Sequence, residues 1–124
     1  MCDKYGIPYP KTFVVRPNEW EQGVAEADLT EEKIGFKYPI IVKPSMSSTY
    51  WEHPFDHMKK VYTAQNPAEA AHILGLIFGA GYPDEVLLQD MVVGEDCNMN
   101  VLTAYCDRNC KVKLICFGRE GLEE

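Results

Sequence analysis

A lysine at the end of an apolar run is the residue of this chain best placed to bind an anion. Tyr-Pro-Ile-Ile-Val occupies positions 38–42, and Lys43 follows directly. Continuous Ile and Val residues are typical of a strand covered on both faces, where an ammonium group is costly unless it meets an anion or reaches water. The next residues, Ser45 to Thr49, offer hydroxyl and backbone N–H donors. This pattern predicts a phosphate site at Lys43, with a lysine that extends to solvent as the alternative.

A second apolar run is interrupted by polar residues. Residues 86–88 are Val-Leu-Leu, which predicts a buried strand, and residues 89–96 mix polar side chains with two valines and a glycine. This pattern indicates a hinge between two parts of the chain. Gln89 and Asp90 can also be interpreted as an exposed strand end, and Asp96 as a turn residue.

Three acid–base side chains lie close together in sequence, at His53, Asp56 and His57. They could form a metal or acid–base cluster. Because their spacing follows neither a helical nor a strand period, solvated histidines are the favoured interpretation.

The cysteines are odd in number. They are Cys2, Cys97, Cys106, Cys110 and Cys116. No CxxC pair occurs and the histidines are distant in sequence, which disfavours a zinc site. Separate reduced thiols fit a chain of this size better than a disulfide framework does.

Composition limits the classes of function. The chain has 124 residues, of which 46% are hydrophobic and 25% charged, as expected for one domain or two small lobes sharing a core. Its net charge of -7 and pI near 4.9 argue against nonspecific binding to nucleic acid or acidic membranes. The sequence has neither an apolar stretch of membrane-spanning length nor a signal peptide at its N-terminus, so a cytoplasmic location is expected.

Local patterns before Lys43 predict a strand and two short helices. Residues 12–15 are β-branched and aromatic, which predicts the strand. Asn18 can cap the first helix. Thr30 can cap a helical turn over 31–34, which Gly35 then ends in a left-handed conformation.

Local patterns after Lys43 predict a loop, a returning strand and a helix. Residues 46–57 lack periodicity and predict a loop of about a dozen residues. Residues 59–64 predict a strand that forms a hairpin with the Lys43 strand. The clearest element is a helix from Pro67 to about Gly79, because Asn66 can cap it and its apolar residues share one face.

Towards the C-terminus, alternating residues from 98 to 105 and the run 111–117 predict two strands. Asp107-Arg108-Asn109-Cys110 supplies turn residues between them. The two strands are expected to form a β-hairpin that continues into a longer protein.

Five segments resemble, in order and spacing, the nucleotide-binding part of ATP-grasp enzymes. They are GIPYPKT, YPIIVKPS, KKVYTAQNPAEAAHIL, VLLQDMVVGED and YCDRNCKV. The segments KPSMSSTYW, QDMVVGED and NMNVLTAY are most similar to the D-aspartate ligase-like carboxylate-amine ligases of bacterial peptidoglycan synthesis.

The resemblance implies an α+β fold, with an antiparallel or mixed sheet and flanking helices. Residues 1–88 would form the small ATP-grasp lobe with a phosphate-covering loop at 45–58. Residues 89–96 would form the hinge, and residues 97–124 the first hairpin of a second lobe.

The resemblance also assigns the phosphate-binding residues. Lys43 matches the lysine that contacts the ATP phosphates, and Ser45, Ser47 and Ser48 lie in the loop that covers them. Lys11 is a candidate for a second phosphate lysine.

The resemblance also assigns the adenosine-binding residues, most of which lie in the hinge. Gln89 and the Asp90 carbonyl would face the adenine amino group, the Val92 N–H would face a ring nitrogen, and Asp96 would accept the ribose hydroxyls. A purine edge requires such a donor and acceptor on rigid backbone, and ribose hydroxyls favour a carboxylate.

The implied activity is ATP-dependent amide-bond formation through an acyl phosphate, with D-aspartate as a plausible substrate. The family's Mg-binding residues and catalytic arginine lie largely beyond the C-terminus of this chain, and spacing does not identify Glu120, Glu123 or Glu124 as a metal ligand. The chain alone is therefore expected to be inactive.

Two other classes of function remain open. One is a non-catalytic nucleotide-binding or regulatory module, and the other is an interaction domain in which Lys43 is structural. An exposed edge of the final hairpin could also produce a homodimer.

Overall fold

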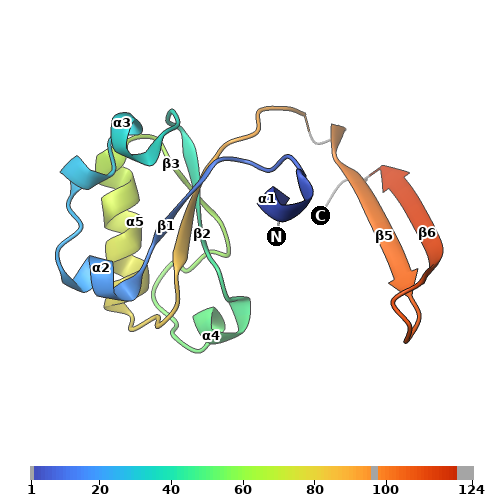
Figure 1. The fold of residues 1–124 in the computed structure, drawn as a ribbon. Coiled ribbons are helices and arrows are strands. Elements are labelled where there is room, and N and C mark those ends of the chain that lie inside the picture. The colour runs from blue at the N-terminus through green and yellow to red at the C-terminus, as the bar shows by residue number, and fades with distance from the viewer. Residues whose placement is uncertain (1, 96–97, 120–124) are drawn as a thin grey trace. The chain divides into compact units, whose positions relative to one another are not determined.

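A four-stranded antiparallel sheet is the centre of the first part of the chain (Figure 1). The computed structural model describes residues 2–95 and 98–119, and the chain divides into two compact units, Met1–Met91 and Val92–Glu124. The boundary between the units falls inside the segment 89–96 that the sequence indicates as a hinge. Asp96, the predicted ribose ligand, lies outside the described residues, as do Glu120, Glu123 and Glu124.

The strand order in the sheet is β1-β4-β2-β3. The strands are β1 (Thr12–Val15), β2 (Ile40–Pro44), β3 (Tyr62–Ala64) and β4 (Val86–Asp90). β4 is the last of the four in sequence, yet it lies between β1 and β2 and pairs antiparallel with both. The predicted hairpin of the Lys43 strand is confirmed, because β2 and β3 pair antiparallel, although β3 begins only at Tyr62.

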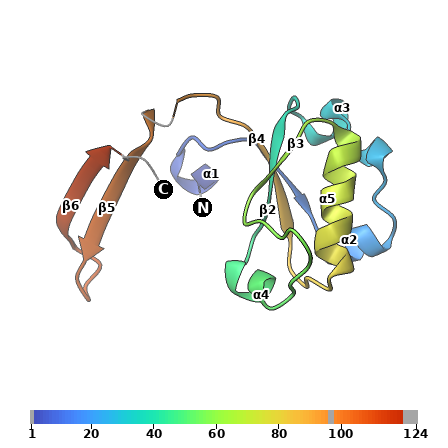
Figure 2. The same ribbon diagram turned by 180° about the vertical axis from the view of Figure 1, so that it is seen from behind.

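One face of the sheet is covered by the helix α5 (Pro67–Gly79), as Figures 1 and 2 show. The predicted bounds and cap of this helix are confirmed: the Asn66 side chain accepts a hydrogen bond from the Glu69 N–H at 2.9 Å. Pro67 occupies the first turn, where its missing N–H is not needed. The helix and the sheet together bury the core, which includes Val15, Ile40, Val42, Ala70, Ile73, Leu74, Ile77, Val86 and Leu88.

Four short helical segments lie before β2. They are α1 (Cys2–Tyr5), α2 (Pro17–Glu21), the 3-10 helix η1 (Glu26–Asp28) and α3 (Glu31–Ile34). The predicted α3 is confirmed, with Thr30 at its N-cap and Gly35 at φ 86° after its last residue.

The prediction that Asn18 caps α2 is wrong. The helix begins earlier, with Arg16 at the N-cap position and Pro17 inside the first turn. The Arg16 backbone N–H donates to the Glu19 carboxylate at 2.9 Å, so the capping interaction comes from the helix's first turn. Proline at the first helical position fixes the start, which local cap preference alone does not reveal.

The prediction that residues 46–57 form a loop is wrong for Ser47–Trp51, which form the short helix α4. Tyr50 is 1% exposed and packs edge-on against Phe55 and Tyr82. A single turn of helix without a repeating apolar face has no periodic signal in the sequence. The helix is stabilised instead by tertiary burial of one aromatic side chain.

The second unit contains a β-hairpin of β5 (Asn100–Cys106) and β6 (Val112–Arg119), which confirms the predicted pairing. The Asp107 carboxylate accepts hydrogen bonds from the N–H groups of Asn109 and Lys111, which closes the turn. Every residue of both strands is exposed.

No helix among residues 2–95 and 98–119 has the length and apolar character needed to cross a membrane.

Candidate nucleotide site

The two faces of the four-stranded sheet differ in burial. Alternate residues of each strand point to opposite faces, and the residues that point toward α5 form the core. We call the other side of the sheet the open face. Apart from the exposed Thr63, its residues are half-buried, and they are Thr12, Val14, Ile41, Lys43, Thr63, Leu87 and Gln89.

Strand register arranges the open face in rows. Lys43 pairs with Leu87, which pairs in turn with Val14, and Ile41 pairs with Gln89 in the next row. Lys43 and Gln89 are therefore diagonal neighbours on adjacent strands, with Cα atoms about 7–8 Å apart. The fold brings the predicted phosphate lysine and the predicted adenine residue to one surface.

Lys43 lies near the end of β2, on the open face between apolar neighbours. It is half-buried, and it forms no ion pair with any of the residues that the structure describes. Lys33 and Lys113, in contrast, are each paired with an aspartate. An unpaired cation on a partly apolar surface is suited to binding an anion.

The three predicted phosphate serines follow Lys43 and are all exposed. Ser45 extends the β2 ladder, because its N–H donates to the Glu85 carbonyl at 3.0 Å. Ser47 and Ser48 begin α4. The three serines are thus exposed, and two of them lie in a helix.

The segment after Ser48 is fixed by a buried tyrosine. The Tyr50 hydroxyl donates to the Lys59 carbonyl at 2.8 Å and lies 2.8 Å from the Tyr62 hydroxyl, which accepts the Lys59 N–H. Burial and then the hydrogen bond with Tyr62 raise the pKa of Tyr50 above its ordinary value of 10.0. Tyr50 is consequently a neutral donor at physiological pH.

Gln89 is the second-last residue of β4, and its side-chain Nε2 donates to Thr12 Oγ1 at 2.8 Å. This bond holds the amide on the open face, across the pair of strands β1 and β4. Asp90 ends β4, and its N–H donates to the Lys11 carbonyl at 2.9 Å. Val92 is exposed and belongs to the second unit.

Lys11, the candidate second phosphate lysine, donates from Nζ to the Gly35 carbonyl at 3.3 Å, at the end of α3. His53 Nδ1 lies 2.9 Å from the Thr49 carbonyl, within the segment around α4. Among the described residues no group of three or more His, Cys, Asp or Glu lies together in a way that could hold a metal ion.

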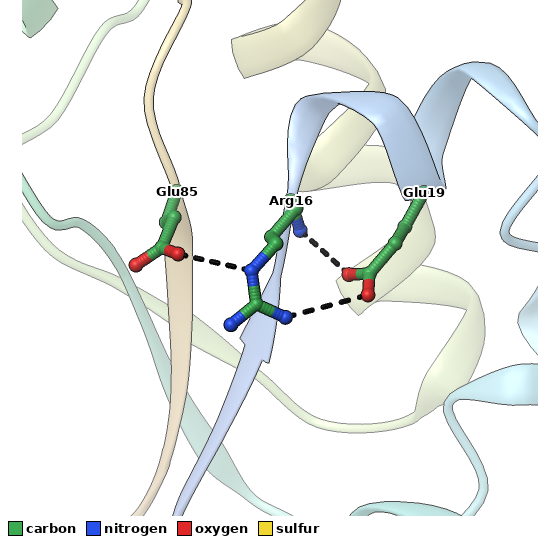
Figure 3. Close-up of polar contacts among 3 residues, drawn as sticks. All are labelled: Arg16, Glu19 and Glu85. Carbon is green, nitrogen blue, oxygen red and sulfur yellow. Dashed lines mark hydrogen bonds and ion pairs between the residues drawn. The ribbon is translucent and has the colours of Figure 1, made fainter.

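The sequence did not single out Arg16 and Glu85, which flank Ser45 at the end of the sheet. Arg16 Nε lies 3.1 Å from Glu85 Oε1, and its Nη1 lies 3.4 Å from Glu19 Oε1 (Figure 3). An arginine directly before a proline reads as the end of a strand, and nothing local indicates a partner 69 positions later. These side chains line a pocket of about 540 Å³ formed by Arg16, Pro17, Asn18, Ser45, Met46, Pro83, Asp84 and Glu85.

Comparisons with known proteins find similarity both in sequence and in structure. D-aspartate ligase from Enterococcus faecium (strain Aus0004) is 37% identical over 124 residues, which is all of this chain and 28% of that protein. The crystal structure of D-alanine-D-alanine ligase from Helicobacter pylori superposes with a TM-score of 0.52 over 94% of this chain and 28% of that one, at 20% identity. No protein-family model matches. The chain thus spans 28% of the length of either protein.

Proposed function

We propose that this chain, which is similar in sequence to D-aspartate ligase as its sequence segments predicted, is the ATP-binding part of an ATP-grasp carboxylate-amine ligase. In the whole protein, ATP would phosphorylate a carboxylate and an amine would then displace phosphate, forming an amide bond. The name of the relative makes D-aspartate the first carboxylate to test. For this chain itself the proposal is limited to nucleotide binding.

Lys43 is the observation that carries this proposal. The residue is half-buried on the open face, has no carboxylate partner among the described residues, and is followed by three exposed serines. A phosphate would neutralise the lysine and accept hydrogen bonds from the hydroxyls of Ser45, Ser47 and Ser48. Two other cations near the sheet are already engaged, Arg16 by two glutamates and Lys11 by a carbonyl.

The adenine would lie at the Gln89 end of the open face. Because Gln89 Nε2 donates to Thr12, the Oε1 atom of the same amide is left to accept a hydrogen bond from the adenine amino group. The Asp90 carbonyl would supply a second acceptor. The half-buried Ile41 and Leu87 offer apolar contact beside them.

Magnesium would belong to the whole protein's reaction, where it neutralises phosphate charge during transfer. The resemblance implies that the magnesium ligands lie beyond this chain, and the proposal keeps that assignment. We expect this chain alone to bind ATP without releasing ADP.

The test is calorimetric titration of ATP and adenosine into the wild-type chain, Lys43→Ala and the control Lys37→Ala. Lys37 is an exposed lysine between α3 and β2, away from the open face. Loss of a charge-assisted contact should weaken ATP binding by Lys43→Ala roughly tenfold or more, with little change in adenosine binding. Lys37→Ala should behave as wild type.

Absence of any effect of ATP or ADP on the melting temperature of the wild-type chain would refute the nucleotide site. The ligase activity has a separate test in the whole protein, which should release ADP when given D-aspartate and an amine acceptor. A whole protein that binds ATP but releases no ADP with any amino acid and amine would instead support the regulatory module.

A further inference from the structure

Tyr82 is a buried tyrosine whose hydroxyl contacts only one residue in the described part of the chain. Its side chain is 2% exposed. The hydroxyl accepts the Met46 N–H at 3.0 Å and lies 3.4 Å from the Met46 carbonyl, to which it can donate. Met46 is the residue before α4, between Ser45 and Ser47. The Tyr82 hydroxyl therefore contacts both backbone polar groups of Met46, whose carbonyl also accepts the Tyr50 N–H at 3.1 Å. Met46 lies within residues 45–48, which we call the serine segment.

Two neighbours of Tyr82 hold the same segment. The Glu85 carbonyl accepts the Ser45 N–H at 3.0 Å, and the Asp84 carboxylate accepts the Thr49 hydroxyl at 2.6 Å. Residues 82–85, which lead into β4, thus fix residues 45–49 at three points. Glu85 in turn forms an ion pair with Arg16 (Figure 3).

We propose that Tyr82 is a positioning residue for phosphate binding: through Met46 its hydroxyl holds Ser45, Ser47 and Ser48 in a fixed place relative to Lys43. This inference rests on the nucleotide site proposed above. A site whose donors are ordered before the ligand arrives loses less conformational entropy on binding. ATP would therefore meet a preformed set of donors.

Packing alone does not require the Tyr82 hydroxyl. The ring packs edge-on against Tyr50, with ring centroids 5.6 Å apart, and a phenylalanine would fill the same space. The hydroxyl is needed only for the two backbone groups of Met46, which is itself exposed at the surface. Tyr82→Phe should consequently change the place of the serine segment more than the packing of the core.

Tyr38→Phe is a matched control. It also removes a half-buried tyrosine hydroxyl that donates to a backbone carbonyl, but that carbonyl belongs to Leu29, outside residues 45–49. Thr49→Val is a second test variant, because it removes the hydrogen bond to Asp84 with little change in side-chain volume. Together the three variants distinguish the effect of removing a hydroxyl from the effect of releasing residues 45–49.

The experiment is calorimetric titration of ATP and adenosine into the wild-type chain and the three variants, with melting temperatures measured in parallel. Tyr82→Phe should weaken ATP binding roughly threefold to tenfold, and Thr49→Val by a similar or smaller factor, with adenosine binding unchanged. Tyr38→Phe should bind both ligands as wild type. Since adenosine lacks phosphates, a purely structural role for Tyr82 would not produce this difference.

Three results would overturn the inference. If wild type binds ATP and both Tyr82→Phe and Thr49→Val bind it equally well, the positioning role fails while the nucleotide site stands. If both variants lose ATP and adenosine affinity in parallel, their effect is on general stability. If the wild-type chain binds neither ligand, the proposed function fails and this inference fails with it.

Discussion

The sheet of the first unit and the hairpin of the second use similar apolar residues but bury them very differently. Leu88 in β4 and Leu74 in α5 are fully buried, whereas Leu102 in β5 is 63% exposed and Phe117 in β6 is 71% exposed. Both regions have regular antiparallel pairing. Strand pairing by itself therefore does not create a core.

The difference between the two regions is the helix α5. It covers one face of a four-stranded sheet and completes a two-layer arrangement, which is the usual requirement for burying a sheet face. A two-stranded hairpin without such a layer has marginal stability. The stability of the first unit should therefore depend on side-chain packing, and that of the hairpin chiefly on cross-strand pairs.

The largest expected effect comes from making the same leucine-to-alanine substitution in both regions. Leu74→Ala should lower the free energy of unfolding by about 2–5 kcal/mol, because it leaves a cavity in the core. Leu102→Ala, at an exposed position, should change it by less than about 0.5 kcal/mol. Urea denaturation measures both. Equal losses would show that the hairpin leucine is buried in solution.

A tyrosine comparison should give an intermediate effect. Tyr50→Phe removes the hydrogen bonds to Lys59 and Tyr62, which should cost about 1–3 kcal/mol of stability at pH 7. Tyr105→Phe, in the exposed hairpin, should cost little.

The same tyrosine gives the sign of a pH effect. The raised pKa of Tyr50 means that folding favours the neutral phenol, so its stabilising contribution is complete below pH 10 and is lost as the pH rises further. Tyr38, whose pKa burial raises to about 12, should add to the loss between pH 10 and about 12. Melting temperatures from pH 8 to 11 should fall less steeply for Tyr50→Phe than for wild type, and parallel curves would contradict the assignment.

The smallest expected difference concerns two asparagines. Asn66→Ala removes the cap of α5 and should cost about 1 kcal/mol. Asn109→Ala leaves the backbone N–H that bonds Asp107 in the hairpin turn, so its effect should be smaller. Thermal denaturation of the two variants measures both losses of stability. A larger loss for Asn109→Ala than for Asn66→Ala would contradict this prediction.

Elements with strong local signals could be predicted from the sequence. The helix α5 has a cap, a proline in its first turn and a continuous apolar face, and its predicted bounds agree with the structure. The helix α3 ends at Gly35, which adopts the left-handed conformation that its sequence predicts. Asp107 to Cys110 contains enough turn residues to predict the hairpin.

Features that depend on distant residues could not be predicted. The helix α4 exists because Tyr50 is buried against Phe55 and Tyr82, and neither contact leaves a periodic signal. The hydrogen bond between Gln89 and Thr12 joins residues 77 positions apart, so its existence depends on strand order. The proposed site residues came from resemblance, and their shared surface from the register of β2 and β4.

The position of β4 in the sheet has a consequence for a chain emerging from the ribosome. β1 and β2 do not pair with each other, since each is joined to β4, which is made last. During synthesis β1 therefore has no strand partner until residues 86–90 have been made, whereas β2 and β3 can form their hairpin earlier. The strand that carries Gln89 and Asp90 is thus also the one that completes the sheet. A nascent chain can therefore complete the sheet, and place the Gln89 and Asp90 contacts proposed for adenine, only after β4 has been made.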